Sequence, residues 1–244
     1  MVKQNTTIIY ENTVAGTFVR RMNRFTAEVL IDGASQIVHV KNTGRLQELL
    51  MPEAKVTLQK TLNPNRKTAY DLISVYKPKL KWVNIDSLAP NALMKQQLMS
   101  LNYELVKPEY TYGESRIDFY MERDGERFLT EVKGCTLADD LHRGTGLFPD
   151  APTERGVKHL HELAKAAKEG YHCSIAFVIQ MNGIHRVIPN EAAQPEFKEA
   201  LVKAAKAGVQ IVCYSCHVEA DSIKITGVVE DTSRFVEAQR RKSE

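Results

Sequence analysis

Residues 116–133 read RIDFYMERDGERFLTEVK and carry the strongest local signal in the chain. The Asp124-Gly125 pair lies between two runs of β-forming residues, the pattern of two strands joined by a two-residue turn. Such a turn sets the register, because Arg123 must then pair with Glu126. Counting back along both strands places Asp118 directly opposite Glu131. The segment therefore predicts two carboxylates side by side on one face of a hairpin.

Lys133 shares that face because it lies two residues beyond Glu131. The intervening side chains should point to the opposite face: Ile117, Phe119, Thr130 and Val132. Opposed like charges destabilise a sheet, so the carboxylate pair needs a compensating cation. Either Lys133 or a surface arginine neutralises an exposed pair, or the pair binds a metal ion.

In the metal interpretation, Asp118 and Glu131 are oxygen ligands for Mg²⁺ or Mn²⁺, since such an ion needs only one or two protein carboxylates. The ion would polarise a phosphodiester and lower the pKa of a bound water. Lys133 would stabilise the nucleophile or the charge that develops on the phosphate. These three residues are the candidate catalytic site.

Upstream of the hairpin, the chain alternates short β-like runs with turns rich in Gly, Asn and Pro. Strands are expected at 14–21, 25–31, 36–40, 55–60 and 69–75. Five short strands with a helical piece at 45–50 are typical of a small closed OB-type barrel, with a β-sandwich fragment as the alternative. The charged, proline-containing stretch 77–82 is expected to be a linker.

Downstream of that stretch, helices and strands are mixed. Helices are expected at 88–101, 154–168, 196–207 and 233–241, and strands at 116–121, 128–132, 174–180, 209–216 and 223–228. This order implies a central mixed sheet flanked by helices. The predicted fold is therefore mixed α/β (α+β), with an OB-like domain over residues 1–80 and an α/β domain over residues 81–244.

The composition fits a globular cytoplasmic protein, because no apolar run is long enough to span a membrane and the first residues lack the pattern of a secretory signal. Cys213, Cys216 and His217 match a haem-attachment spacing, but they lie in an apolar run that predicts an ordinary strand. Residues 1–80 hold twelve Lys and Arg against six Asp and Glu, while the whole chain has a net charge of only +3. The basic N-terminal third suggests a polyanionic partner, although a solvated basic surface is equally compatible.

The Asp118, Glu131-x-Lys133 arrangement resembles the PD-(D/E)xK nuclease superfamily. Further stretches make the resemblance more specific: VHVKNTGRL at 38–46, RKTAY at 66–70, SRIDF at 115–119, FPDAPTERG at 148–156 and KHL at 158–160. Together they identify the chain as similar to the sugar fermentation stimulation protein A family. That resemblance implies an OB-like domain followed by a nuclease-like domain, DNA binding of low sequence specificity, and Asp118, Glu131 and Lys133 as the site.

One feature departs from the wider superfamily pattern. Many members supply a further acidic ligand from the helix before the hairpin, yet residues 91–102 contain no Asp or Glu. Glu104 or Glu114 would have to replace it, or the site has two carboxylates only.

The expected nucleic-acid contacts lie in both domains. In the barrel they are Asn42, Arg45, Arg66, Lys67 and Tyr70, because basic side chains beside an aromatic residue are typical of a single-strand groove. In the α/β domain they are Arg116, Arg155 and Lys158, the last two near a helix start that attracts phosphate. Solvated turns and helix faces are the competing interpretation, and His159 is expected to be an ordinary packing residue.

Two functions remain open from the sequence. One is a DNA-binding protein, with RNA as an alternative ligand, that hydrolyses phosphodiesters with Mg²⁺ or Mn²⁺. The other is a non-catalytic DNA-binding regulator linked to sugar (maltose) metabolism with a vestigial site. Neither involves a membrane, and a homodimer is left open.

Overall fold

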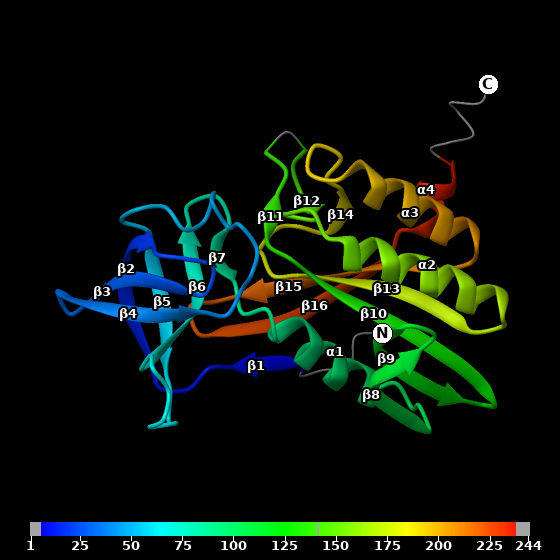
Figure 1. The fold of residues 1–244 in the computed structure, drawn as a ribbon, viewed down its shortest axis with the longest axis horizontal. Coiled ribbons are helices and arrows are strands. Elements are labelled where there is room, and N and C mark those ends of the chain that lie inside the picture. Colours follow the sequence, from blue (N-terminus) through cyan, green and yellow to red (C-terminus); the bar gives the residue numbers. More distant parts are fainter. Residues whose placement is uncertain (1–5, 141, 238–244) are drawn as a thin grey trace.

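The structure is a computed structural model that describes residues 6–140 and 142–237. Figure 1 shows a β-barrel at one end of the molecule and a larger α/β domain at the other, with the first strand of the chain running from the larger domain toward the barrel. The expected mixed α/β (α+β) architecture, an OB-like barrel followed by a helix-flanked mixed sheet, is confirmed.

The barrel is formed by the five strands that the sequence predicts. They are β2 (Thr13–Arg21), β3 (Thr26–Ile31), β4 (Ala34–Val40), β5 (Lys55–Lys60) and β6 (Tyr70–Lys77). Parallel pairing of Val40 in β4 with Leu72 in β6 closes the sheet. Fully buried side chains such as Phe18, Val29 and Leu58 fill the interior. The closure excludes a β-sandwich fragment.

The stretch predicted as a linker is instead a β-hairpin, so that prediction was wrong. Residues Lys77 and Lys81 pair across a tight turn, and β7 (Lys81–Asn84) extends the barrel sheet beyond β6. The hairpin is stabilised by apolar packing that the high local charge concealed, because Leu80 and Val83 are buried. The expected domain division at residue 80 falls within this turn.

A seven-stranded sheet organises the second domain. Its order is β1 (Thr7–Ile9), β16 (Ser222–Glu230), β15 (Gln210–Val218), β13 (His172–Ile179), β10 (Glu126–Cys135), β9 (Ser115–Arg123) and β8 (Leu105–Tyr112). The central strands β10, β13 and β15 are parallel, and the remaining neighbours are antiparallel. A small second sheet contains β11 (Leu137–Ala138), β12 (Thr145–Phe148) and β14 (Arg186–Pro189). The segment containing Cys213 and Cys216 is the strand expected, with both thiols buried.

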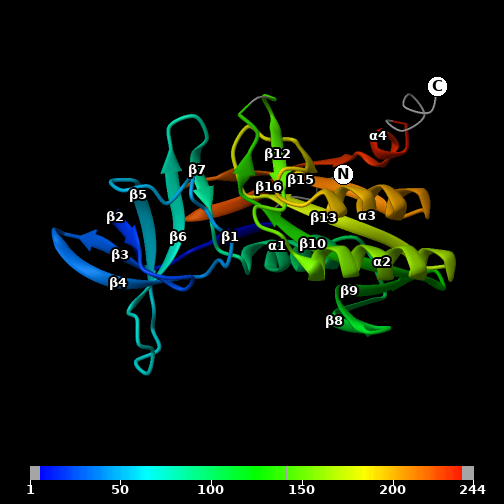
Figure 2. The ribbon, with the colours of Figure 1, turned by 45° about the horizontal axis from the view of Figure 1, so that its top comes forward.

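Helices cover both faces of the large sheet, as Figures 1 and 2 show. Helices α2 (Glu154–Lys168) and α3 (Pro195–Lys206) pack together on one face, and α4 (Thr232–Glu237) follows β16. Helix α1 (Ala89–Met99) packs on the other face, where Leu93 and Met94 share a core with Val132. Helix α2 begins at the predicted residue, Glu154, and the Thr153 hydroxyl caps it by accepting from Gly156 N at 3.0 Å. The expected terminal helix beyond residue 237 lies outside the described residues.

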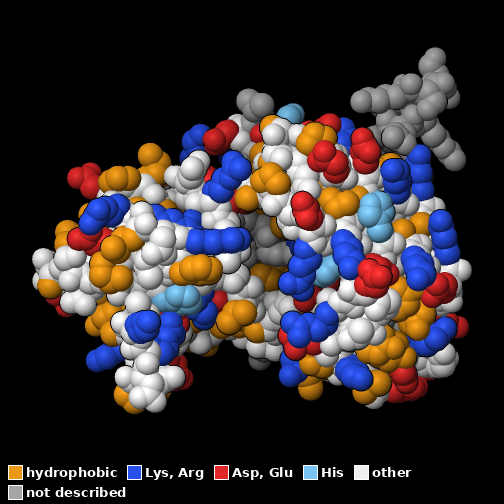
Figure 3. All heavy atoms as spheres, in the orientation of Figure 1, with side chains coloured by type: hydrophobic (Ala, Val, Ile, Leu, Met, Phe, Trp, Pro, Cys, Tyr) orange, Lys and Arg blue, Asp and Glu red, His pale blue; other side chains and the backbone are white. Residues whose placement is uncertain are grey.

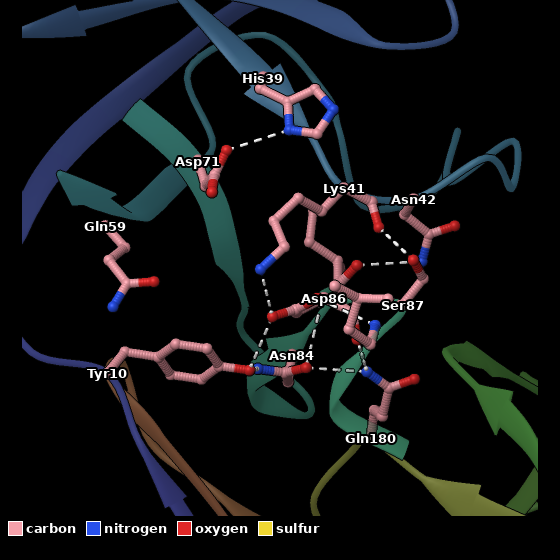
Figure 4. A network of polar contacts seen from close by, with 12 residues as sticks. Tyr10, His39, Lys41, Asn42, Gln59, Asp71, Asn84, Asp86, Ser87 and Gln180 are labelled. Atoms are coloured by element: carbon pink, nitrogen blue, oxygen red, sulfur yellow. Dashed lines mark hydrogen bonds and ion pairs between the residues drawn. The ribbon is translucent and has the colours of Figure 1, made fainter. Parts of the chain in front are cut away.

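A buried polar network joins the barrel to the α/β domain (Figure 4). Asp86, in the connection between β7 and α1, accepts from Lys41 Nζ of the barrel at 2.8 Å and from Tyr10 OH at 3.3 Å. Gln180, just after β13, donates to Asn84 Oδ1 at 2.8 Å and to the Asp86 carbonyl at 3.0 Å. A buried polar group that loses its hydrogen-bond partner destabilises the protein. This network should therefore fix the angle between the domains.

Replacing Asp86 with Ala should destabilise the protein by about 3 kcal/mol, because Lys41 then remains partly buried without its carboxylate. The free energy of unfolding in urea measures the effect. A matched charge deletion is Asp140→Ala, which breaks the exposed pair between Lys79 and Asp140 and should change stability by less than about 0.5 kcal/mol. If the two variants lost equal stability, Asp86 would contribute no more than an exposed ion pair, and its proposed role in the network would be wrong.

Candidate functional site

The hairpin that carries the candidate site has the predicted turn and register. Asp124 and Gly125 both have positive φ, 53° and 78°, as a two-residue turn of this type requires. The β9–β10 ladder pairs Arg123 with Glu126 and continues to the pairing of Phe119 with Thr130. The register is therefore confirmed up to the residues next to Asp118 and Glu131.

Beyond Phe119 the two strands separate. The Asp118 carboxylate turns into the gap and accepts from Val132 N at 2.8 Å, in place of a backbone carbonyl from β9. Strand β9 also twists here, because Ile117 and Phe119 pack in different hydrophobic cores. The prediction that Ile117 and Phe119 point to the same face was therefore wrong, because simple strand alternation does not continue through the separation.

Asp118 is anchored from helix α1 as well. Asn91 Nδ2 donates to Asp118 Oδ1 at 2.8 Å, so this helix offers an amide and not a further carboxylate. Burial raises the pKa of Asp118 above its ordinary value, and the charge of Glu131 raises it further. The hydrogen bond from Val132 N and the charge of Lys133 offset these effects only in part. Asp118 and Glu131 are therefore electrostatically coupled.

Glu131 is the most deeply buried charged residue of the site, with 2% of the residue exposed. Its Oε1 accepts from Lys133 Nζ at 2.5 Å and from His159 Nδ1. Burial alone would raise the pKa of Glu131, but the charge of Lys133 and the hydrogen bond from His159 hold it below its ordinary value. The second oxygen, Oε2, is buried and has no hydrogen-bond partner.

His159 is a site residue that the sequence analysis assigned to ordinary packing. It lies on α2, and its Nε2 accepts from Arg155 Nε at 3.3 Å, one helical turn earlier. With Nε2 accepting, Nδ1 must carry the proton that is donated to Glu131. The i, i+4 spacing of Arg155 and His159 was the available signal, but only the fold shows that this helix face meets β10.

The donor set fits a cation that requires few protein ligands. Within residues 6–140 and 142–237, no three His, Cys, Asp or Glu side chains are grouped to hold a metal ion. The two carboxylates with Oε2 of Glu131 unpartnered match an ion such as Mg²⁺, which takes one or two carboxylates and keeps several waters. The proposed substitute ligands do not contribute in the structure. Glu104 accepts from Asp124 N at the hairpin tip, and Glu114 pairs with Lys158 at 3.3 Å.

A cleft of about 300 Å³ opens beside Lys133, between the two domains. Arg24, Asn42 and Thr43 line it from the barrel, and the segments 133–136 and 147–153 line it from the α/β domain. Figure 3 shows basic side chains on both sides of this hollow. Asp150 braces the cleft, because its carboxylate accepts from Leu46 N of the barrel at 3.1 Å. Of the predicted site residues, Lys133 and Asn42 line this cleft, while Asp118 and Glu131 lie outside its lining.

The nucleic-acid-binding residues predicted in the barrel differ in how far their side chains are already engaged within the protein. Arg45 and Lys67 are exposed. Asn42 is committed to the loop, since it accepts from Gly44 N and donates to the Ile85 carbonyl. Arg66 forms a bidentate pair with Asp71, at 2.6 and 2.8 Å, and Tyr70 packs against the core.

The predicted contacts of the α/β domain lie on β9 and α2, the elements that carry Asp118 and His159. Arg116 is exposed and lies 3.6 Å from Glu109, while Arg155 and Lys158 lie in the first turns of α2. The sequence analysis missed Arg21, whose guanidinium donates to the carbonyls of Asn42, Gly44 and Arg45 among others. This arginine shapes the loop that lines the cleft.

The fold and site together define a two-domain protein in which an OB-like barrel faces an α/β domain carrying a buried carboxylate pair. The model of the sugar fermentation stimulation protein RE domain matches residues 85–222, and that of the SfsA N-terminal OB domain matches residues 19–85. The chain belongs to the sugar fermentation stimulation protein family.

Relatives match over nearly their whole length. Sugar fermentation stimulation protein homologues from Ruminiclostridium cellulolyticum and Clostridium acetobutylicum are 46% and 45% identical, over 91% and 89% of this chain and 98% and 96% of theirs. The structure of Pyrococcus furiosus SfsA in complex with Ca²⁺ superposes with a TM-score of 0.80 at 26% identity, covering 91% of this chain and 96% of that one. Among the described residues, the helices are all too short or too polar to cross a membrane.

The opposite pKa shifts of the two carboxylates predict opposite effects of neutralising them in EDTA. The raised pKa of Asp118 means that its charge lowers stability above its ordinary value of 3.8. Asp118→Asn should therefore gain roughly 0.5–1 kcal/mol at pH 7, and the gain should vanish as the pH falls below that value.

The lowered pKa of Glu131 means that its charge contributes stability above its ordinary value of 4.5, which is lost as the pH falls through the folded value. Glu131→Gln should lose about 2 kcal/mol at pH 7, because Lys133 and His159 lose their shared charged partner. Denaturant unfolding at pH 7 and in mild acid measures both variants. If both variants gained stability at pH 7, or both lost it, the opposite pKa shifts assigned to the two carboxylates would be wrong.

Proposed function

We propose that the protein binds nucleic acid with little sequence preference and hydrolyses phosphodiester bonds with the help of a divalent cation. The observation that carries this proposal is the buried Oε2 of Glu131, which has no partner. A buried carboxylate oxygen requires a donor or a cation to offset its lost hydration. The charge interaction of Glu131 with Asp118, and the hydrogen bond to it from Lys133, which lines the cleft, favour a cation bound where a substrate can reach it.

Asp118 and Glu131 would hold Mg²⁺ or Mn²⁺, which would polarise the phosphodiester and lower the pKa of a bound water. Asn91 and Val132 N orient Asp118. His159 and Arg155 orient Glu131 from α2. Such fixed surroundings keep the ligands in place without reorganisation during the reaction.

Lys133 has a different task in this proposal. Its ammonium group donates to Glu131, and the residue also lines the cleft, so Lys133 links a carboxylate of the site to the space for substrate. A cation in that position stabilises negative charge that develops on a phosphate. A relative of the same fold forms a complex with Ca²⁺, a hard cation that takes oxygen ligands, and this supports a cation site in the family.

Hydrolysis of labelled single-stranded and duplex oligonucleotides tests the proposal, in Mg²⁺, Mn²⁺ or EDTA. The wild-type protein should cleave only with metal. Asp118→Asn and Glu131→Gln should lower the rate by at least about 100-fold, since each removes a charged ligand. Lys133→Met should lower kcat more than metal affinity, because its contribution is to the transition state.

Glu126→Gln is a matched control on the same strand, since this glutamate lies at the exposed end of β10 with 60% of its side chain accessible. It should cleave at the wild-type rate. Full activity in both site variants would refute the site. An inactive wild-type protein that still binds DNA would favour the non-catalytic regulatory role instead.

Binding should be mainly electrostatic and centred on the basic barrel, so affinity should fall steeply with salt and vary little with sequence. Replacing Arg24, which lines the cleft, with Gln should reduce the slope of log affinity against log salt concentration by about 1, as expected for one lost phosphate contact. Lys203→Gln, on the exposed face of α3, should leave the slope unchanged. An unaltered slope in the Arg24 variant would place the phosphates elsewhere.

A further inference from the structure

A second hollow, of about 400 Å³, lies on the barrel beside the interdomain cleft. The two hollows share Asn42 and Thr43 in their walls, and the neighbours Arg24 and Phe25 line one hollow each. They are therefore neighbours on either side of the loop that follows β4. A ligand that occupies both would run from the barrel to Lys133.

The walls of the second hollow contain large apolar side chains that are exposed to solvent. Phe25, before β3, is 53% exposed, and Leu88, before α1, is 65% exposed. They come from different domains and line the same space. Large apolar side chains exposed around a polar floor mark a binding surface rather than a solvated face.

The polar floor of this hollow is rigid. Asp71 accepts from both guanidinium nitrogens of Arg66 and from His39 Nδ1 at 3.0 Å. Burial would raise the pKa of Asp71, but these hydrogen bonds outweigh it and keep the carboxylate ionised. An ionised carboxylate only accepts, so Nδ1 of His39 donates to it. Arg66 presents a fixed planar group.

We propose that the two hollows form one track for single-stranded nucleic acid, in which an unpaired base enters between Phe25 and Leu88 over Arg66 and His39, and the backbone passes Arg24 to reach Lys133. This inference rests on the proposed function for the end of the track, and it adds the substrate class. Aromatic and guanidinium planes stack on any base, which matches low sequence preference.

The chemistry favours a single strand over a duplex. Base faces are available for stacking only when the base is unpaired, and stacking on Phe25 needs such a face. Basic residues along the track are placed for a backbone: Arg24 at the junction and Lys133 at the carboxylates. A free nucleotide could fill the barrel hollow but would leave the cleft and Lys133 without contact.

Fluorescence anisotropy of the full chain in EDTA tests the track without dependence on cleavage. Phe25→Ala should weaken binding of a labelled single-stranded oligonucleotide roughly tenfold and leave binding of the matching duplex nearly unchanged. Met51→Ala is the matched control, because Met51 is a barrel residue with 57% exposure that lines neither hollow. That variant should bind both ligands as the wild-type protein does.

Equal single-strand affinity in Phe25→Ala and the wild-type protein would overturn the proposal, as would an equal loss of duplex binding. Competition by a mononucleotide as strong as that by the oligonucleotide would also overturn it, because the site would then be a nucleotide pocket. Selective loss of single-strand binding by a protein that never cleaves would retain the track and reject only the proposed hydrolysis.

Discussion

The carboxylate of Glu131 is the constraint around which the site is arranged. It is buried on β10 with one oxygen bonded to Lys133 and His159 and the other without a partner. Desolvation of a charge this deep is tolerated only with close compensation, and Lys133 and His159 supply enough to lower its pKa. The other oxygen, Oε2, is buried without a partner, and a bound cation would supply one. The pKa of Asp118 is shifted in the opposite direction, because burial and the charge of Glu131 raise it.

The surrounding fold explains how such a site can exist. Separation of β9 from β10 at Asp118 lets a carboxylate enter the sheet and bond to Val132 N. Immediately beyond Lys133, Gly134 is required, because a Cβ there would lie 2.4 Å from Gln180 Oε1. The same Gln180 belongs to the network that fixes the barrel through Asp86. The site and the interdomain cleft are therefore parts of one rigid arrangement.

Local signals in the sequence were sufficient for the barrel strands, the start of α2 and the β9–β10 register, because turn chemistry and capping act within a few residues. They failed where tertiary contacts decide. The hairpin at 77–84 appeared as a charged linker, since burial of Leu80 and Val83 has no local signature. His159 was missed as a partner of Glu131, and Phe25 as a wall of the barrel hollow. Both depend on segments distant in sequence coming together.

The central claim is that Asp118 and Glu131 bind a divalent cation, and calorimetric titration of the pure protein with Mn²⁺ tests it most directly. The account predicts one binding site in the wild-type protein and an affinity at least roughly tenfold lower in Asp118→Asn, a variant expected to remain fully folded. Absence of binding by the wild-type protein, or the same affinity in that variant, would contradict it.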